Sequence, residues 1–91
     1  MYTISAKLTF HISHSDSLKY KRKIRRSLIE KTRHKFNVSI SEVGTQDNHK
    51  TLTIGVAVVA GDASHARDSM EEIIRFMEIH TDAELISVEL C

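Results

Sequence analysis

The sequence predicts a single α+β domain over residues 1–91 with the ferredoxin-like order β-α-β-β-α-β, in which two helices cover one face of a four-stranded antiparallel sheet. Apolar and polar residues alternate through the first twelve positions, as in a half-buried strand. Two later segments repeat apolar residues at the helical period, and a hairpin pattern lies between them. Ninety-one residues, 41% of them hydrophobic, are enough for one such core.

The first strand is predicted over residues 2–12, where every even position is apolar. A polar loop follows, and Ser17 is suited to cap a helix because its hydroxyl can accept hydrogen bonds from the first turn. The predicted helix then directs one apolar stripe at the core, formed by Leu18, Ile24, Leu28, Ile29 and Phe36.

A hairpin is predicted after this helix, with apolar residues at 36, 38 and 40, a turn near Asp47 and Asn48, and renewed alternation over 52–58. Asp62 is the expected N-cap of a second helix. Its apolar positions follow the helical template without a break: Ala66, Met70, Ile73, Ile74 and Met77. Ile86, Val88 and Leu90 indicate a fourth strand.

The net charge of +1 conceals a strong separation of charge along the chain. Residues 1–50 contain 11 lysines and arginines against 4 acidic residues, whereas residues 51–91 contain 2 against 8. Nine basic residues and one acidic residue lie between Lys19 and Lys35, on the first predicted helix. Such a distribution points to an anionic partner, or to an acidic surface on the same or a neighbouring molecule.

Local stability does not explain this basic run. Like charges four residues apart on a helix cost a few tenths of a kcal/mol per pair, and several such pairs occur here, including Lys19 with Lys23 and Arg22 with Arg26. Cations in the first turn oppose the helix dipole at a cost of about 0.3 to 1 kcal/mol each. An anion bound at this end would turn both penalties into attraction.

The leading hypothesis is therefore that the first helix binds the phosphates of an RNA. The first candidates are Lys19, Arg22, Lys23 and Arg26, and the supporting candidates are Lys21, Arg25, Arg33 and Lys35. Ser15 and Ser17 are expected to add hydroxyl donors for an anion at the helix N-terminus. Lys21 and Arg25 fall within the arc of the apolar stripe, so they are expected to overhang the sheet near the helix start.

The basic helix is also compatible with roles that involve no RNA. It can be a solvated face, or it can pair with the acidic residues of the second helix, namely Asp68, Glu71, Glu72 and Glu78. The same complementarity between molecules would make the protein a homo-oligomer or a protein-interaction module. An enzyme or binder for a small phosphorylated ligand would use the loop from Ser13 to Arg22, with His14 and Asp16 as candidate acid–base groups by proximity only.

The common sequence motifs of phosphate binding, metal binding and acyl transfer are absent. The sequence contains no G-x-x-G loop, no Walker motif, no C-x-x-C pair and no G-x-S-x-G elbow. Of six histidines only His11 and His14 are close, and on a strand they would point to opposite faces. The outer face of the predicted sheet has no aromatic side chains on which bases could stack. We expect no catalytic residues, no metal site and no cofactor.

The compartment is predicted from the cysteine count and the hydropathy pattern. Cys91 is the lone cysteine, so the chain forms no internal disulfide, as is typical of a reducing compartment. The first dozen residues lack a secretory pattern, and the longest apolar run, residues 56–60, is far shorter than a membrane span. We expect a cytoplasmic protein that does not contact membranes.

Three segments of the sequence carry a resemblance to known proteins: SLKYKR at 17–22, KFNVSISEV at 35–43 and IGVA at 54–57, supported by Ser27-Leu28 and Gln46-Asp47. Together they resemble the YlxP-like family of small bacterial proteins. The resemblance implies a ferredoxin-like fold and no established activity. Because members tend to be encoded among translation and ribosome-maturation genes, it also implies ribosomal RNA or a ribosomal particle as the partner.

The sequence departs from the family pattern at three places. Tyr20 replaces a usually acidic residue that would complete a capping box, which leaves the helix start more positive. His49 stands where the family commonly has Trp, and Ser13-His14 replaces a Pro-Gly-containing loop. The expected function is nevertheless that of a non-enzymatic RNA- or ribosome-associated module.

Overall fold

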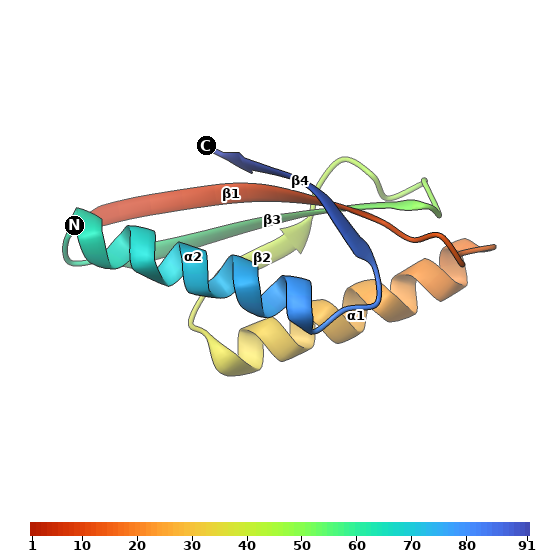
Figure 1. Cartoon of the computed structure of the whole chain (residues 1–91), viewed down its shortest axis with the longest axis horizontal. Coiled ribbons are helices and arrows are strands. Elements are labelled where there is room, and N and C mark those ends of the chain that lie inside the picture. Colours follow the sequence, from red (N-terminus) through yellow and green to blue (C-terminus); the bar gives the residue numbers. More distant parts are fainter.

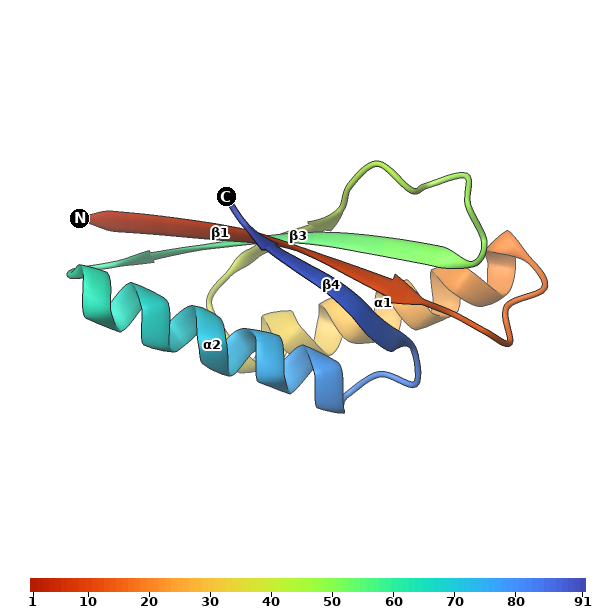
Figure 2. The ribbon, with the colours of Figure 1, turned by 45° about the horizontal axis from the view of Figure 1, so that its top comes forward.

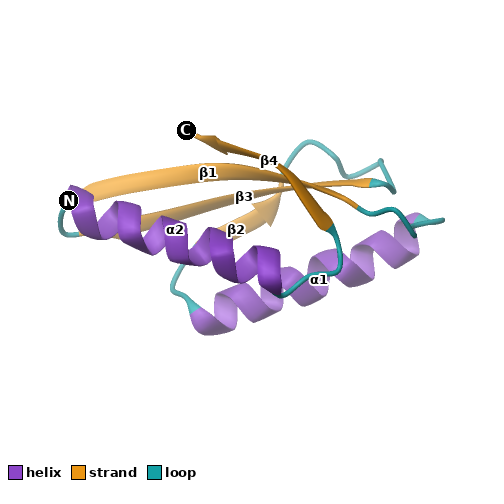
Figure 3. Ribbon diagram, viewed as in Figure 1, coloured by secondary structure: helices purple, strands orange, loops and turns teal.

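The computed structural model describes residues 1–91 and contains the six elements in the predicted order (Figure 1). They are β1 (Tyr2–His11), α1 (Leu18–Lys35), β2 (Ser39–Glu42), β3 (Thr51–Ala60), α2 (Ala63–Ile79) and β4 (Glu84–Leu90). The strands form one antiparallel sheet in the order β2-β3-β1-β4, and both helices lie on the same face of it (Figure 3). The predicted ferredoxin-like fold is confirmed.

The core lies between the sheet and the two helices. Alternation along β1 buries Ala6, Leu8 and Phe10, and β3 contributes Leu52 and Ile54 from the same face of the sheet. Helix α2 adds a further set of buried side chains: Ala66, Met70, Ile73 and Met77. Helix α1 contributes one apolar residue that is fully buried, Leu28, while its other apolar residues pack at the edge of the core. Helix α1 therefore keeps most of its surface in solvent.

Both predicted helix caps are confirmed. Ser17 has an extended backbone, and its hydroxyl oxygen accepts a hydrogen bond from the Tyr20 N–H at 3.2 Å. The carboxylate of Asp62 accepts one from the His65 N–H at 2.8 Å. Each cap pairs one of the N–H groups that a helix start leaves without an internal partner.

The structure differs from the sequence prediction at β2. The strand begins at Ser39 and not at Phe36, because the helix extends to Lys35 and Phe36 closes it. The Phe36 ring packs edge-on against Phe76 of α2, with ring centroids 5.3 Å apart. An aromatic contact between the helices thus replaces the first residues of the expected strand.

Strand β4 is present as predicted, yet only Leu85 packs against the core, while Ile86, Val88 and Leu90 are exposed. Helix α2 packs mainly on β1 and β3, while β4 crosses beside it at the sheet edge (Figure 2). A bulge shifts the register between Thr9 and Phe10, which leaves Ile86 as an extra residue in β4. Neither helix is long and apolar enough to pass through a bilayer.

Candidate functional site

The start of α1 is held from inside the protein. Ser15 is buried, and its hydroxyl donates to the backbone carbonyl of Ser17 at 3.1 Å. Ser17 is half-buried and caps the helix through its hydroxyl oxygen. The Ser15 hydroxyl, expected from the sequence to face an anion, is thus directed inward, so Ser15 is not part of the candidate surface.

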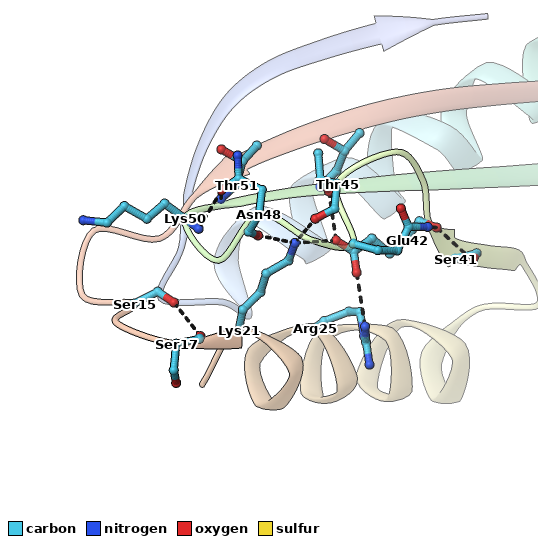
Figure 4. Close-up of polar contacts among 12 residues, drawn as sticks. Ser15, Ser17, Lys21, Arg25, Ser41, Glu42, Thr45, Asn48, Lys50 and Thr51 are labelled. Atoms are coloured by element: carbon cyan, nitrogen blue, oxygen red, sulfur yellow. Dashed lines mark hydrogen bonds and ion pairs between the residues drawn. The ribbon is translucent and has the colours of Figure 1, made fainter. Parts of the chain in front are cut away.

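Lys21 is the most buried charged residue of the chain, with 1% of its surface exposed. Its ammonium group lies 2.7 Å from a carboxylate oxygen of Glu42 and also donates to the backbone carbonyls of Thr45 and Asn48 (Figure 4). Three acceptors satisfy the three donors of a lysine. The loop at residues 43–50 folds over the helix start and closes this cluster (Figure 4). Lys21 therefore lies inside the protein, and no anion at the surface can reach its charge.

Arg25 contributes to the same cluster from the next turn of α1. Its guanidinium donates to the second carboxylate oxygen of Glu42 at 3.2 Å, while the Thr45 hydroxyl donates to the first at 2.8 Å. The Thr45 hydroxyl also accepts from the Thr53 N–H of β3 at 2.9 Å. One carboxylate thus joins α1, β2, the loop and β3. We call Lys21, Arg25, Glu42, Thr45 and Asn48 the Lys21 cluster.

The cluster changes the acidity of Glu42. Burial by itself raises the pKa of this carboxyl group, but hydrogen bonds from Lys21, Thr45 and Arg25, together with the charge of Lys21, outweigh that effect and lower the pKa below its usual value. The ionised form is therefore favoured by folding. Because the folded-state pKa is depressed, the stabilisation is present above the unfolded-state pKa and is lost as the pH falls through the folded-state value.

This predicts acid-dependent stability. Between pH 7 and about pH 3, the free energy of unfolding of the wild type should fall more steeply than that of Glu42→Gln, which has no carboxyl group to protonate. The gap between the two proteins should narrow as the pH falls below 4.5, the ordinary pKa of a glutamate side chain. Urea denaturation across this range measures both curves. A constant gap at every pH would contradict the assignment of the charge to Glu42.

The four first candidates lie together on the exposed side of α1. Lys19, Arg22, Lys23 and Arg26 are all exposed, and they alone line one surface concavity of about 280 Å³. Their spacing of three and four residues places them on one side of the helix, opposite the buried Leu28. We call these four residues the basic concavity.

Two larger grooves adjoin the basic concavity. One groove of about 400 Å³ lies between α1 and β2 and contains Arg25, Arg26 and Arg33. The other, of about 420 Å³, lies between α1 and the end of α2 and contains Lys23 and Lys31. Arg26 and Lys23 each line the concavity as well as one groove, so a predominantly basic track crosses α1 from β2 to the end of α2. Its acidic residues are Glu30 and Glu42 in the groove beside β2 and Asp82 in the groove beside α2.

The remaining candidate residues lie toward the end of α1. Arg33 is exposed and donates to the Ile40 carbonyl of β2 at 3.1 Å, which holds the guanidinium beside the α1–β2 groove. Lys35 is exposed at the last turn and lines none of the main concavities. Arg33 thus belongs to the track, whereas Lys35 lies beyond it.

No acidic side chain of α2 pairs with α1. The ion pairs of the protein are Lys7 with Glu89, Lys21 with Glu42 and Arg25 with Glu42. The four residues of the basic concavity consequently have no carboxylate within 4.0 Å. The structure therefore does not support the hypothesis that acidic residues of the second helix neutralise the charge of the first helix within one molecule.

The remaining surfaces show fewer features of a binding site. The five main concavities do not include residues 13–17, the start of the loop that a small phosphorylated ligand would use. No three His, Cys, Asp or Glu side chains come close enough to hold a metal ion. On the open sheet face, β1 places Thr3, Ser5 and Lys7 beside Val59, Ala57 and Gly55 of β3, with no aromatic ring among them.

Sequence reasoning missed one part of the track. Lys31 and Ser27 line the groove against the end of α2, where His80 stacks on Phe76 with ring centroids 4.0 Å apart. The charge count includes Lys31, and helical spacing places it two turns after Lys23. Which residues of α2 face them depends on how the helices pack, and no pattern along the chain shows that.

Comparison with known proteins gives two results. A family model described as "Protein of unknown function (DUF503)" matches residues 3–90. The chain is also 31% identical over 68 residues to "Uncharacterized protein YlxP" of Bacillus subtilis, an alignment that covers 75% of this chain and 74% of that protein. Both results agree with the resemblance seen in the sequence.

Proposed function

Because the chain belongs to the DUF503 family of proteins of unknown function, to which the YlxP-like resemblance also pointed, we propose its role from its surface: it is a non-enzymatic protein that binds the phosphate backbone of structured RNA along α1. One observation supports this proposal above all others. Four exposed basic side chains line one concavity, and none of them has a carboxylate within 4.0 Å.

The chemistry of these side chains fits phosphate groups. Arg22 and Arg26 offer planar guanidinium groups that can hold a phosphate with two parallel hydrogen bonds. Lys19 and Lys23 add point charges on flexible stems. The repulsion among four like charges at helical spacing is relieved when phosphates lie between them. Binding of a polyanion thus stabilises the basic concavity more than hydration by water does.

The proposal also defines the kind of RNA. Contacts to phosphates position a nucleic acid without reading its sequence. The open sheet face lacks the aromatic side chains on which single-stranded bases stack. The shape of a folded or double-stranded RNA would therefore determine selectivity, and ribosomal RNA, which the YlxP-like resemblance suggested, is the first RNA to test.

Salt dependence tests the proposal. We expect the protein to co-sediment with ribosomal subunits and to lose affinity steeply with salt. If the four residues of the basic concavity and Arg33 neutralise five phosphates, the slope of log K against log salt is about −3.5 to −4.5. Raising the salt from about 50 to about 200 mM would then weaken binding about 100- to 500-fold. Absence of binding at about 50 mM salt, or a slope flatter than about −1, would reject the proposal and favour a protein partner.

A further inference from the structure

Strand β4 exposes a row of apolar side chains at the edge of the sheet. Ile86, Val88 and Leu90 are 57%, 42% and 62% exposed. Val88 and Leu90 lie opposite Leu8 and Ala6 of β1, so they belong to the face of the sheet that carries the helices. Helix α2 packs on β1 and β3 and leaves this part of the face open. Exposed apolar rows of this kind usually mark an interface.

The backbone of β4 also has a free edge. The N–H of Cys91 donates to the Ser5 carbonyl of β1 at 2.9 Å. Because N–H and C=O groups alternate in direction along an antiparallel strand, those of Val88 and Leu90 point away from β1, where the sheet ends. Natural sheets usually shield such an edge with a proline, a charge directed inward or a bulge. Here the bulge lies before Ser87, and the chain contains no proline.

We propose that β4 pairs antiparallel with β4 of a second copy of this chain, with Val88 opposite Val88 at a two-fold axis. In this register Ser87 lies opposite Glu89 of the second copy, and Ile86, the residue at the bulge, marks the end of the paired segment opposite Leu90. Val88 and Leu90 share the face of the sheet that carries the helices, and the outward N–H and C=O groups of the two strands meet each other. The interface uses the same residues on both copies, as a two-fold dimer requires.

The residue pattern of β4 favours a second copy of this chain as the partner that pairs with this edge. Residues 86–90 read apolar, polar, apolar, polar, apolar, so the pattern is unchanged when the strand is reversed. No like charges oppose each other across the axis, because Glu89 faces Ser87 and pairs with Lys7 of its own chain at 3.7 Å. Glu84 lies beyond the paired segment. A strand that matches itself in this way needs no other protein to cover its edge.

The dimer has a geometric consequence for α1. A two-fold axis perpendicular to the joined sheet keeps all helices on one face. Both basic concavities then face the same side of the assembly. This arrangement does not depend on what α1 binds, and dimerisation is tested without any RNA.

Two measurements test the dimer. Sedimentation equilibrium should show a dimer that dissociates on dilution, and Val88→Lys, which places two ammonium groups at the axis, should weaken association on the order of 30-fold or more. Val59→Lys is the matched control, because Val59 is 66% exposed and lies on the open face of β3. Amide hydrogen exchange of the wild type should show that Val88 and Leu90 are protected at high concentration and exchange fast when the dimer dissociates.

The outcomes separate the possible interfaces. A protein that is monomeric at about 1 mM overturns the proposal. So does a dimer in which the Val88 and Leu90 amides exchange fast, since its interface would lie elsewhere, as in pairing between basic and acidic helices. Association that weakens with Val88→Lys and persists with Val59→Lys supports pairing through β4. The hydrogen-exchange result uses the wild type alone, so it decides the matter even if a variant fails to fold.

Discussion

Replacing Arg22 and Arg26 with glutamate is expected to weaken binding to structured RNA by about 100-fold or more at about 0.1 M salt, while the protein stays folded. Each lost phosphate contact lowers the slope of log K against log salt by about 0.7 to 0.9. Reversal of the charge also introduces repulsion between the new carboxylates and the phosphates. Both side chains are exposed and have no ion-pair partner, so their replacement leaves the core unchanged.

The matched control is Arg67→Glu with Arg75→Glu on α2. It changes the net charge by the same amount, and these arginines are exposed and line none of the main concavities. Binding of ribosomal particles by the control should stay within about 3-fold of the wild type. Equal losses in both double variants would mean that the total charge matters and the place does not. Full binding by a folded Arg22→Glu, Arg26→Glu protein would remove α1 from the interface.

Lys21→Ala should cost about 3 to 5 kcal/mol of the free energy of unfolding, the range typical of removing one partner of a buried ion pair. The substitution leaves the Glu42 carboxylate and the carbonyls of Thr45 and Asn48 without their buried donor. The total free energy of unfolding of a small domain is only about 5 to 15 kcal/mol. The loop at residues 43–50 would lose its attachment to α1.

Urea denaturation measures this effect, with Lys23→Ala as the control. Lys23 lies two residues further along the same helix, and because it is exposed its removal should change stability by no more than about 0.5 kcal/mol. Lys21→Met combined with Glu42→Leu should be more stable than Lys21→Ala, because no charge is left buried alone. A loss below about 1 kcal/mol for Lys21→Ala would show that water reaches the Lys21 cluster.

Lys21 and Lys23 show how far the sequence predicts the candidate site. Both belong to one basic run, and the helical period places Lys21 toward the sheet and Lys23 toward solvent. The period does not reveal that a loop more than twenty residues later folds over Lys21, nor that Glu42 provides its counter-charge. The sequence thus predicted which side of α1 each residue occupies, and tertiary contacts decided which charges stay available.

The sequence by itself determined the order of the six elements, both helix caps and the basic face of α1. These features depend on residues within one or two turns of each other, and local periods and propensities record such contacts. Only the tertiary structure decided that Lys21 is internal, that Phe36 closes a helix, and that the apolar side of β4 lies uncovered. Each of these three features depends on how segments distant in the sequence pack together. Burial arises only when those segments meet, so the residue pattern along the chain does not predict it.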